Sequence, residues 1–222
     1  MTQIDVIIPN LNYGKYLRQC LESVRLQHVK KNIYLIDGGS TDNTFDILED
    51  YPEVKISKVK GNLRVAITYG LSHSHGDYIV CFASDNVMLP SFLELAQQTL
   101  DDNEDVGLVY GGAIKIDSDG KILGLLDVGG PFSKKRLRQR NFIDWSTGVF
   151  RREAWGNKEF PRWLIYHLDW FVWLEIMKKW RVVDLEQPVI FYRKHSESHS
   201  SLKNREILQE YILLKMKLHG KP

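Results

Sequence analysis

Two short acidic segments in this chain carry the residue types that bind phosphate-bearing ligands and cations. Asp37 opens the segment Asp-Gly-Gly-Ser-Thr-Asp after the apolar run 33–36, and Asp85 stands in Ser-Asp-Asn after the apolar run 78–82. In an open α/β sheet, ligands bind at the carboxyl ends of the strands, so both segments are expected to face one cleft. Together they suggest a site for a nucleoside diphosphate and its cation. Taken singly, each segment is better explained as an ordinary turn.

The elements that must position these segments alternate along the first hundred residues. Apolar runs typical of buried strands alternate with stretches that carry apolar residues at helical spacing. The expected strands are residues 4–9, 33–37, 54–59 and 78–83, and the expected helices are residues 14–27, a short helix capped by Thr41 or Asp42, 63–74 and 90–100. This alternation predicts an α/β fold with a mostly parallel central sheet flanked by helices.

The alternation ends after residue 103. Residues 106–116 are expected to form a long strand, which turns into a hairpin with residues 121–126. Two short strands are expected near 182–183 and at 189–192, and the basic run 134–140 is expected to be a solvated loop. We predict a single domain over residues 1–222, with a nucleotide half at about 1–103, an acceptor half at about 104–200 and a C-terminal helix at 201–222.

The composition is that of an ordinary globular protein. The 222 residues are 43% hydrophobic and 26% charged, and the net charge of +2 gives no argument for nucleic acid as a partner. Cys20 and Cys81 lie in apolar runs and are expected to be buried thiols of a reducing compartment. Since the start lacks the pattern of a signal peptide and no apolar stretch reaches the length of a membrane span, we expect a cytoplasmic protein.

Several motifs occur in an order that identifies a family. Val-Ile-Ile-Pro-Asn-Leu-Asn at 6–12 precedes the Asp37 segment, and Gly-Asp-Tyr-Ile at 76–79 leads into Ala-Ser-Asp-Asn at 83–86. Further motifs stand at 146–152, 167–170 and 192–195. From residue 4 to about residue 200, this series resembles glycosyltransferase family 2. The resemblance implies a GT-A (Rossmann-like) fold with a smaller acceptor-side hairpin and helix region, and transfer of a sugar from a nucleotide-sugar donor with inversion at the anomeric carbon.

Three positions depart from the family pattern. Gly38 stands where the family usually has a second aspartate, although a subset carries Asp-Gly-Gly-Ser, and Ala83 replaces the first polar residue of the metal loop. Asn86 follows Asp85 in place of another aspartate. Asp85 is then the one strong ligand for a divalent cation, Mn²⁺ or Mg²⁺. The donor's phosphates and water would complete the coordination shell, as is common for Mg²⁺.

The resemblance also assigns roles in catalysis. Asp169 corresponds to the base that takes the proton of the acceptor hydroxyl; the alternative is that it merely caps a helix. Asp85 is expected to hold the cation, with Ser84 shaping its loop. His195 is a candidate for a further metal ligand or phosphate donor, against the simpler interpretation of a loop histidine.

Other residues are expected to bind the two substrates. The base and ribose of the donor are expected to meet Pro9, Asn10, Asn12 and Asp37. Arg64 could contact the phosphates, and a solvated arginine at the start of a helix is an equally good interpretation. Candidates for the acceptor site are Trp145, Gly148 and Trp170. Because most aromatic residues in such stretches belong to the core, we expect only one or two to be exposed.

The expected function is transfer from a UDP-linked sugar to a glycan or lipid-linked acceptor in surface polysaccharide synthesis. A non-catalytic module that only binds nucleotide sugars is the alternative, whereas the sequence lacks the loops of a nucleotidyltransferase or an aspartyl phosphatase. The last helix carries a narrow apolar face bordered by Lys203, Arg205, Lys215, Lys217 and Lys221. It could contact an anionic membrane at its inner surface, although packing on the domain is the commoner outcome for such a helix.

Overall fold

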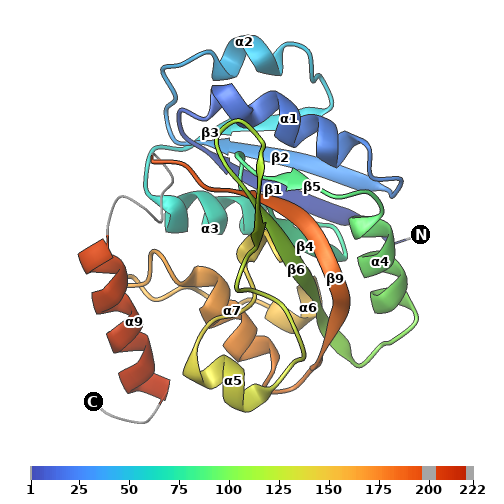
Figure 1. Ribbon diagram of the computed structural model, residues 1–222, viewed down its shortest axis with the longest axis vertical. Helices are drawn as coiled ribbons and strands as arrows, with labels where there is room; N and C mark the ends of the chain where they lie inside the picture. Colours follow the sequence, from blue (N-terminus) through green and yellow to red (C-terminus); the bar gives the residue numbers. More distant parts are fainter. Residues whose placement is uncertain (1, 197–203, 219–222) are drawn as a thin grey trace.

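The computed structural model describes residues 2–196 and 204–218 (Figure 1). Among these residues, nine strands form one sheet in the order β3-β2-β1-β4-β8-β6-β9-β5, with β7 added beside β6. The strands are β1 (Ile4–Asn10), β2 (Lys31–Asp37), β3 (Val54–Lys58), β4 (Tyr78–Cys81), β5 (Val87–Met88), β6 (Val106–Ile116), β7 (Ile122–Leu125), β8 (Gly148–Arg151) and β9 (Arg181–Arg193). The strands from β3 to β4 are parallel, and β8 runs antiparallel to β4.

Helices cover both faces of the sheet. They are α1 (Gly14–Arg25), α2 (Thr44–Leu48), α3 (Leu63–His73), α4 (Phe92–Asp101), α5 (Lys134–Gln139), α6 (Arg152–Trp155), α7 (Leu168–Ile176) and α9 (Asn204–Leu218), with a 3-10 turn η1 (Trp145–Thr147). Successive residues of a strand point to opposite faces. Val6 therefore packs in one core with α1, α2 and α4, whereas Ile7 packs in the other with α3, α6 and α7. The predicted α/β class is confirmed.

The parallel strands bring the two acidic segments to one edge of the sheet. In the β1–β2 register Asn10 pairs with Asp37, and both are the last residues of their strands. Strand β4 lies on the other side of β1 and runs in the same direction. The Asp85 segment, which follows β4, therefore leaves the sheet at the same edge.

Two expected elements are corrected. The basic run is a short helix, α5, whose first turn is capped by the Oγ of Ser133 accepting from the backbone N–H of Arg136 at 3.3 Å. Only Leu137 of α5 is buried, so the run has no apolar periodicity to reveal the helix. The two short strands are one strand, β9, which stays continuous past Pro188 because its register against β6 shifts near Gly112.

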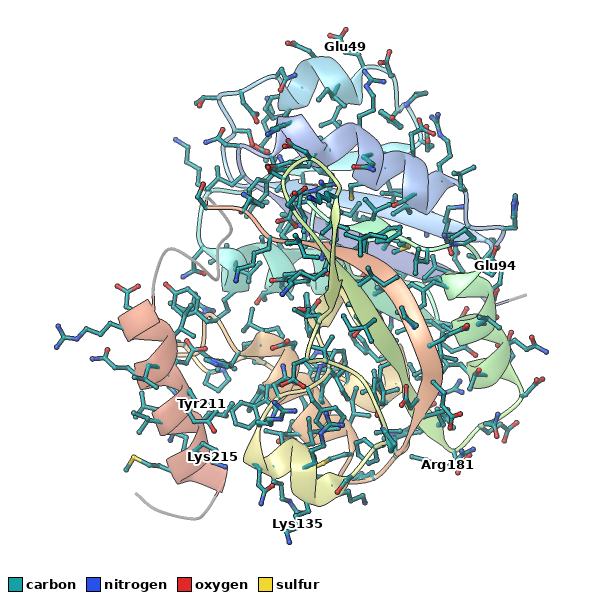
Figure 2. The ribbon with its side chains drawn as sticks, viewed as in Figure 1. Glu49, Glu94, Lys135, Arg181, Tyr211 and Lys215 are labelled. Atoms are coloured by element: carbon teal, nitrogen blue, oxygen red, sulfur yellow. The ribbon has the colours of Figure 1, made fainter. Side chains whose placement is uncertain are left out.

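The C-terminal helix α9 packs against the acceptor half, as Figure 2 shows for Tyr211 and Lys215. The Tyr211 hydroxyl donates to the Gln139 carbonyl at 3.0 Å, and Lys215 donates to the same oxygen at 3.0 Å. Of the predicted basic border, Lys203 and Lys221 lie outside the described residues. Within the described residues, no helix is both long enough and apolar enough to cross a membrane. Cys20 and Cys81 are both buried, as predicted.

Candidate active site at the carboxyl edge of the sheet

The first acidic loop is organised around the carboxylate of Asp37. Its Oδ1 accepts from the backbone N–H groups of Gly39 and Ser40 at 2.9 and 2.8 Å. Its Oδ2 accepts from the Ser40 hydroxyl at 2.5 Å and from Asn10 Nδ2 at 3.1 Å. Burial acts to raise the pKa of Asp37, but these bonds outweigh it and leave the pKa below its ordinary value. Since both oxygens are engaged, Asp37 shapes the loop between β2 and α2.

Neighbouring polar side chains tie this loop to the end of β1. The backbone N–H of Asn12 donates to Ser40 Oγ at 2.9 Å, and Asn12 Oδ1 accepts from the backbone N–H of Thr41 at 2.8 Å. Asn12 has φ 58°, a left-handed conformation that asparagine tolerates better than most residues. Asp42 Oδ2 accepts from the N–H of Gly14 at 2.7 Å, which caps α1 from the opposite loop.

The second acidic loop is held by two residues distant in the sequence, Ser146 of the η1 turn and Arg193 of β9. Asn86 donates through Nδ2 to the Ser146 hydroxyl at 3.1 Å and accepts from the backbone N–H of Arg193 at 3.0 Å. The Arg193 guanidinium donates to the Asp85 carbonyl at 2.9 Å. Arg193 is only 2% exposed and was not identified as important from the sequence. Its place in the Tyr-Arg-Lys-His motif was the available signal.

Asp85 and His195, the two predicted metal ligands, lie side by side. Asp85 Oδ2 is 3.0 Å from His195 Nε2, and the rings of Tyr13 and Tyr16 contact the imidazole. A carboxylate oxygen beside an imidazole nitrogen is a donor set that suits Mn²⁺. No group of three or more His, Cys, Asp or Glu residues suited to a metal occurs in the described part of the chain. Among the described residues, Asp85 and His195 are thus the two side chains that could hold a cation here, and further ligands would have to come from a bound molecule or from water.

Asp144 is a third carboxylate of this region, and the sequence analysis missed it. Its Oδ1 accepts from the backbone N–H of Ser146 at 2.9 Å and so caps the η1 turn. Burial raises the pKa of Asp144 to about 6, and the nearby charge of Asp85 adds to the rise. The sequence pattern Asp-Trp-Ser, with aspartate two residues before serine, is typical of such a cap and gives no sign of the neighbouring charge.

Asp169, the predicted base, stands in the first turn of α7. Its Oδ1 accepts from the backbone N–H of Trp170 at 2.7 Å, and its Oδ2 accepts from Asn141 Nδ2 at 2.8 Å. Burial and then the charge of Asp144 raise the pKa of Asp169 to about 7. A general base is most effective when its pKa lies near the working pH. The charge of Asp85 therefore acts on the pKa of Asp144, and the charge of Asp144 acts on the pKa of Asp169.

The candidate acceptor residues differ in exposure, and the burial of Trp170 corrects the expectation that it contacts the acceptor. Trp170 is fully buried, and its Nε1 donates to the Leu137 carbonyl at 2.6 Å, so its ring packs in the core and cannot stack on a sugar. Trp145 is half-buried and contacts the ring of Trp173. Gly148 is buried, and a Cβ at this position would lie 3.0 Å from the Trp173 ring. The packing of Trp173 explains the glycine.

Four candidate residues carry buried polar atoms without a hydrogen-bond partner among the described residues. These atoms are Asn10 Oδ1, Arg64 Nε, Ser84 Oγ and Trp145 Nε1. Buried polar atoms in proteins are nearly always bonded to protein or to ordered solvent. Their concentration in residues selected for donor and acceptor binding fits a polar ligand. Pro9, the remaining donor candidate, is half-buried at the end of β1.

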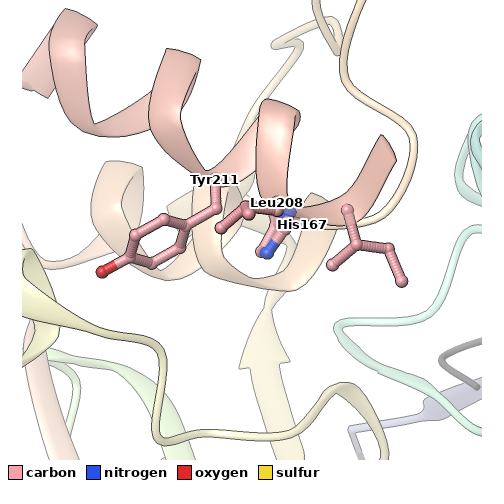
Figure 3. Close-up of a pocket in the computed structure, with 4 residues that line it drawn as sticks. His167, Leu208 and Tyr211 are labelled. Carbon is pink, nitrogen blue, oxygen red and sulfur yellow. The ribbon is translucent and has the colours of Figure 1, made fainter. Parts of the chain in front are cut away.

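A separate pocket lies beside α9 and contains none of the strand-end residues. It has a volume of about 460 Å³, and Figure 3 shows His167, Leu208 and Tyr211 at its wall. Ile207 completes the lining, which is mostly apolar. The pocket is therefore a feature of the junction between α9 and α7.

Solved structures of similar shape define the class of fold. A structure of S. aureus TarS in complex with UDP-GlcNAc matches with a TM-score of 0.72 at 18% identity, covering 91% of this chain and 61% of that chain. The mannosyltransferase PcManGT from Pyrobaculum calidifontis, in complex with GDP-Man and Mn²⁺, matches with a TM-score of 0.72 at 17% identity, covering 100% and 65%. At these identities the likeness concerns the fold, which is the GT-A fold.

The sequence comparisons then give the family. The model of glycosyl transferase family 2 matches residues 5–158, and the chain belongs to this family of transferases. An uncharacterized glycosyltransferase of Nostoc sp. is 26% identical over 230 residues, which cover 94% of this chain and 70% of that protein. The glycosyltransferase GlyG of Streptococcus pneumoniae is 32% identical over 125 residues, covering 53% and 41%. Chondroitin synthase of Pasteurella multocida is 26% identical over 158 residues, covering 68% and 16%. The chain thus spans less than half of some of its curated relatives.

Proposed function

We propose that this chain transfers a sugar from a nucleoside diphosphate sugar to an acceptor hydroxyl, with inversion at the anomeric carbon. The observation that carries the proposal is geometric: Asp85 lies beside His195, Ser146 links the Asp85 loop to Asp144, and Asn141 holds the buried carboxylate of Asp169. This arrangement joins a place for a cation to a carboxylate suited to accept a proton. A module that only binds nucleotide sugars has no need of the second feature.

In the proposed reaction, the oxygen of the acceptor hydroxyl forms a bond to the anomeric carbon. Asp169 accepts the proton of that hydroxyl as the bond forms. The bond between that carbon and the diphosphate oxygen breaks on the opposite face, and the electron pair leaves with the nucleoside diphosphate. Asn141 orients the carboxylate of Asp169 for this step through its 2.8 Å bond. The charge of Asp144 helps to keep the pKa of Asp169 near neutrality.

A divalent cation held by Asp85 and His195 would supply charge neutralisation for the departing diphosphate. For the donor, Asn10, Arg64 and Ser84 offer polar atoms without a protein partner among the described residues. Asp37 and Asn12 act by fixing the loop at the end of β2, and Pro9 borders it. Trp145 and the η1 turn before Gly148 are proposed to border the acceptor.

The proposed donor is UDP-linked, and the proposed role is in surface polysaccharide synthesis with a glycan or lipid-linked acceptor. The TarS structure with UDP-GlcNAc supports the first point, and the similarity to chondroitin synthase and hyaluronan synthase of Pasteurella multocida supports the second. A cytoplasmic location fits the two buried thiols.

We also propose contact between the outer face of α9 and an anionic lipid surface. Ile212, Leu213 and Met216 are exposed apolar side chains of this helix that do not line the pocket beside α7. The same helix carries the exposed cations Arg205 and Lys217, and α5, which contacts α9, carries the exposed Lys135. Basic residues beside an apolar stripe are the chemistry that binds anionic headgroups.

The test of donor binding is a thermal-shift screen with UDP-GlcNAc, UDP-glucose and GDP-mannose, with Mn²⁺ and with a chelator. A ligand that binds the native state raises the unfolding midpoint by mass action, so the preferred donor shows the largest rise with Mn²⁺. Release of the nucleoside diphosphate from that donor then separates an enzyme from a binding module. No rise with any nucleotide sugar would contradict the proposal.

A further inference from the structure

The carboxylate of Glu210 on α9 binds the segment that leads into α7. Glu210 accepts from three consecutive backbone N–H groups, those of Ile165, Tyr166 and His167, each at 2.7 Å. The Nδ1 atom of His167 lies 3.2 Å from the same carboxylate. Glu210 is only 4% exposed, although glutamate is rarely buried without partners.

These contacts hold the chain on both sides of Asp169. His167, two residues before Asp169, is the residue at the start of α7 that Glu210 binds. Trp170, the residue after Asp169, stacks on the ring of Tyr211 with centroids 5.3 Å apart and planes at 22°. Glu210 and Tyr211 are neighbours on α9, so one turn of α9 fixes the start of α7 at two points.

We propose that Glu210 is a positioning residue for the catalytic base, acting through the start of α7 on the carboxylate of Asp169. This inference rests on the proposed role of Asp169. A carboxylate that accepts hydrogen bonds from the backbone N–H groups at the entrance to a helix helps to set where the helix begins and how its first turn is rotated. Displacement of a catalytic group by about 1 Å can lower a rate by about 10²-fold, so a small shift of this turn is enough to matter.

The test measures release of nucleoside diphosphate when water replaces the acceptor, with whichever of UDP-GlcNAc, UDP-glucose and GDP-mannose binds most tightly. Glu210→Gln keeps the volume but gives up an acceptor oxygen, so the rate should fall by up to about 10²-fold with the donor Kd unchanged. Glu210→Asp keeps the charge, so its rate of release should lie between the rates of the wild type and of Glu210→Gln. The control is Gln209→Ala, an exposed position one residue away on α9, which should behave as the wild type.

A double-mutant comparison separates positioning from a general structural role. In the Asp169→Asn background, Glu210→Gln should cause no further loss of rate, because its effect passes through Asp169. The positioning role is overturned if Glu210→Gln lowers the rate by the same factor in the Asp169→Asn background as in the wild type. A normal rate for the single variant Glu210→Gln also overturns it. Normal turnover by Asp169→Asn alone would instead refute the proposed base.

Hydrogen exchange tests the contact independently of turnover. The amides of residues 165–167 should exchange faster in Glu210→Gln than in the wild type, while peptides from β1 and β2 stay unchanged. If Glu210→Gln does not fold, the same comparison is made with Glu210→Asp. Unchanged exchange at residues 165–167 in a folded variant overturns the inference.

Discussion

The Oδ2 atom of Asp85 and the Nε2 atom of His195 lie 3.0 Å apart although 110 residues separate them in the sequence. Asp85 follows β4, and His195 follows β9, which runs parallel to β6 and in the same direction as β4, so both strands end at the same edge of the sheet. The side chains are 10% and 4% exposed. A pair so enclosed can direct its two donor atoms to one cation.

Substitutions of this pair test the cation site. Asp85→Asn should weaken Mn²⁺-dependent binding of a nucleoside diphosphate more than His195→Gln does, because Asp85 supplies the only negative charge of the pair. Titration calorimetry of UDP with Mn²⁺ and with a chelator measures both effects. The assignment would be contradicted if the wild type and Asp85→Asn bound UDP with equal affinity in Mn²⁺. Equal affinity of the wild type for UDP in Mn²⁺ and in the chelator would also contradict it.

The sequence allowed the fold and the common edge of the two acidic loops to be predicted because both depend on local patterns, whereas the contact of Asp85 with His195 was not predicted. The apolar runs ending at Asn10 and Asp37 have the spacing of parallel strands, and the rule for strand ends places their loops together. Asp144 was missed for a physical reason. Its interaction with Asp169 arises only when η1 and α7 pack together, and the local sequence around Asp144 indicates no more than a turn.

The burial of Trp170 and the role of Glu210 were also beyond local patterns. Helix α7 is apolar on all sides, so its sequence does not show which aromatic residue faces outward. Glu210 lies on a helix whose charged residues resemble a solvated face. Only the docking of α9 places this carboxylate on the backbone of residues 165–167.

Asp37 should act on stability as well as on donor binding. The carboxylate of Asp37 accepts four hydrogen bonds, and Asp37→Asn replaces one of its two oxygens with an NH₂ group that cannot accept them. Since a hydrogen bond to a charged group contributes about 1.5–3 kcal/mol, the free energy of unfolding should fall. The pKa of Asp37 lies below its ordinary 3.8 when folded, so its contribution is present above that value and is lost as the pH falls through the folded pKa. Urea unfolding at neutral pH should show the full loss, and below about pH 4 the wild type and variant should converge. A constant difference at all pH values would argue against this account of the loop.

The outer face of α9 can be tested with lipid vesicles. The double variant Ile212→Ser and Leu213→Ser should bind vesicles containing phosphatidylglycerol more weakly than the wild type, since both side chains are exposed. The matched control is Ile122→Ser with Leu125→Ser, which removes two exposed apolar side chains from β7. Co-sedimentation measures binding. An equal loss in both variants, or no binding by the wild type, would exclude a specific lipid contact at α9.

The last prediction concerns Asp169→Asn. Loss of the proton acceptor should lower turnover by about 10²–10⁴-fold with little change in donor Kd. If Asp169 only caps the helix, asparagine should replace it with turnover and stability retained.

The same variant should also alter the pH dependence of stability. Burial and the charge of Asp144 raise the folded pKa of Asp169 to about 7 from 3.8. Between these values the folded protein binds more protons than the unfolded chain, so the free energy of unfolding of the wild type falls as the pH rises through this window. Asparagine does not titrate, so the unfolding midpoint of Asp169→Asn relative to the wild type should rise between about pH 4 and pH 7. Asp144→Asn should lower the pKa of Asp169 and narrow that difference, because it removes the neighbouring negative charge. A midpoint difference that does not change with pH would mean that Asp169 titrates normally, and it would remove the electrostatic argument for this residue as the base.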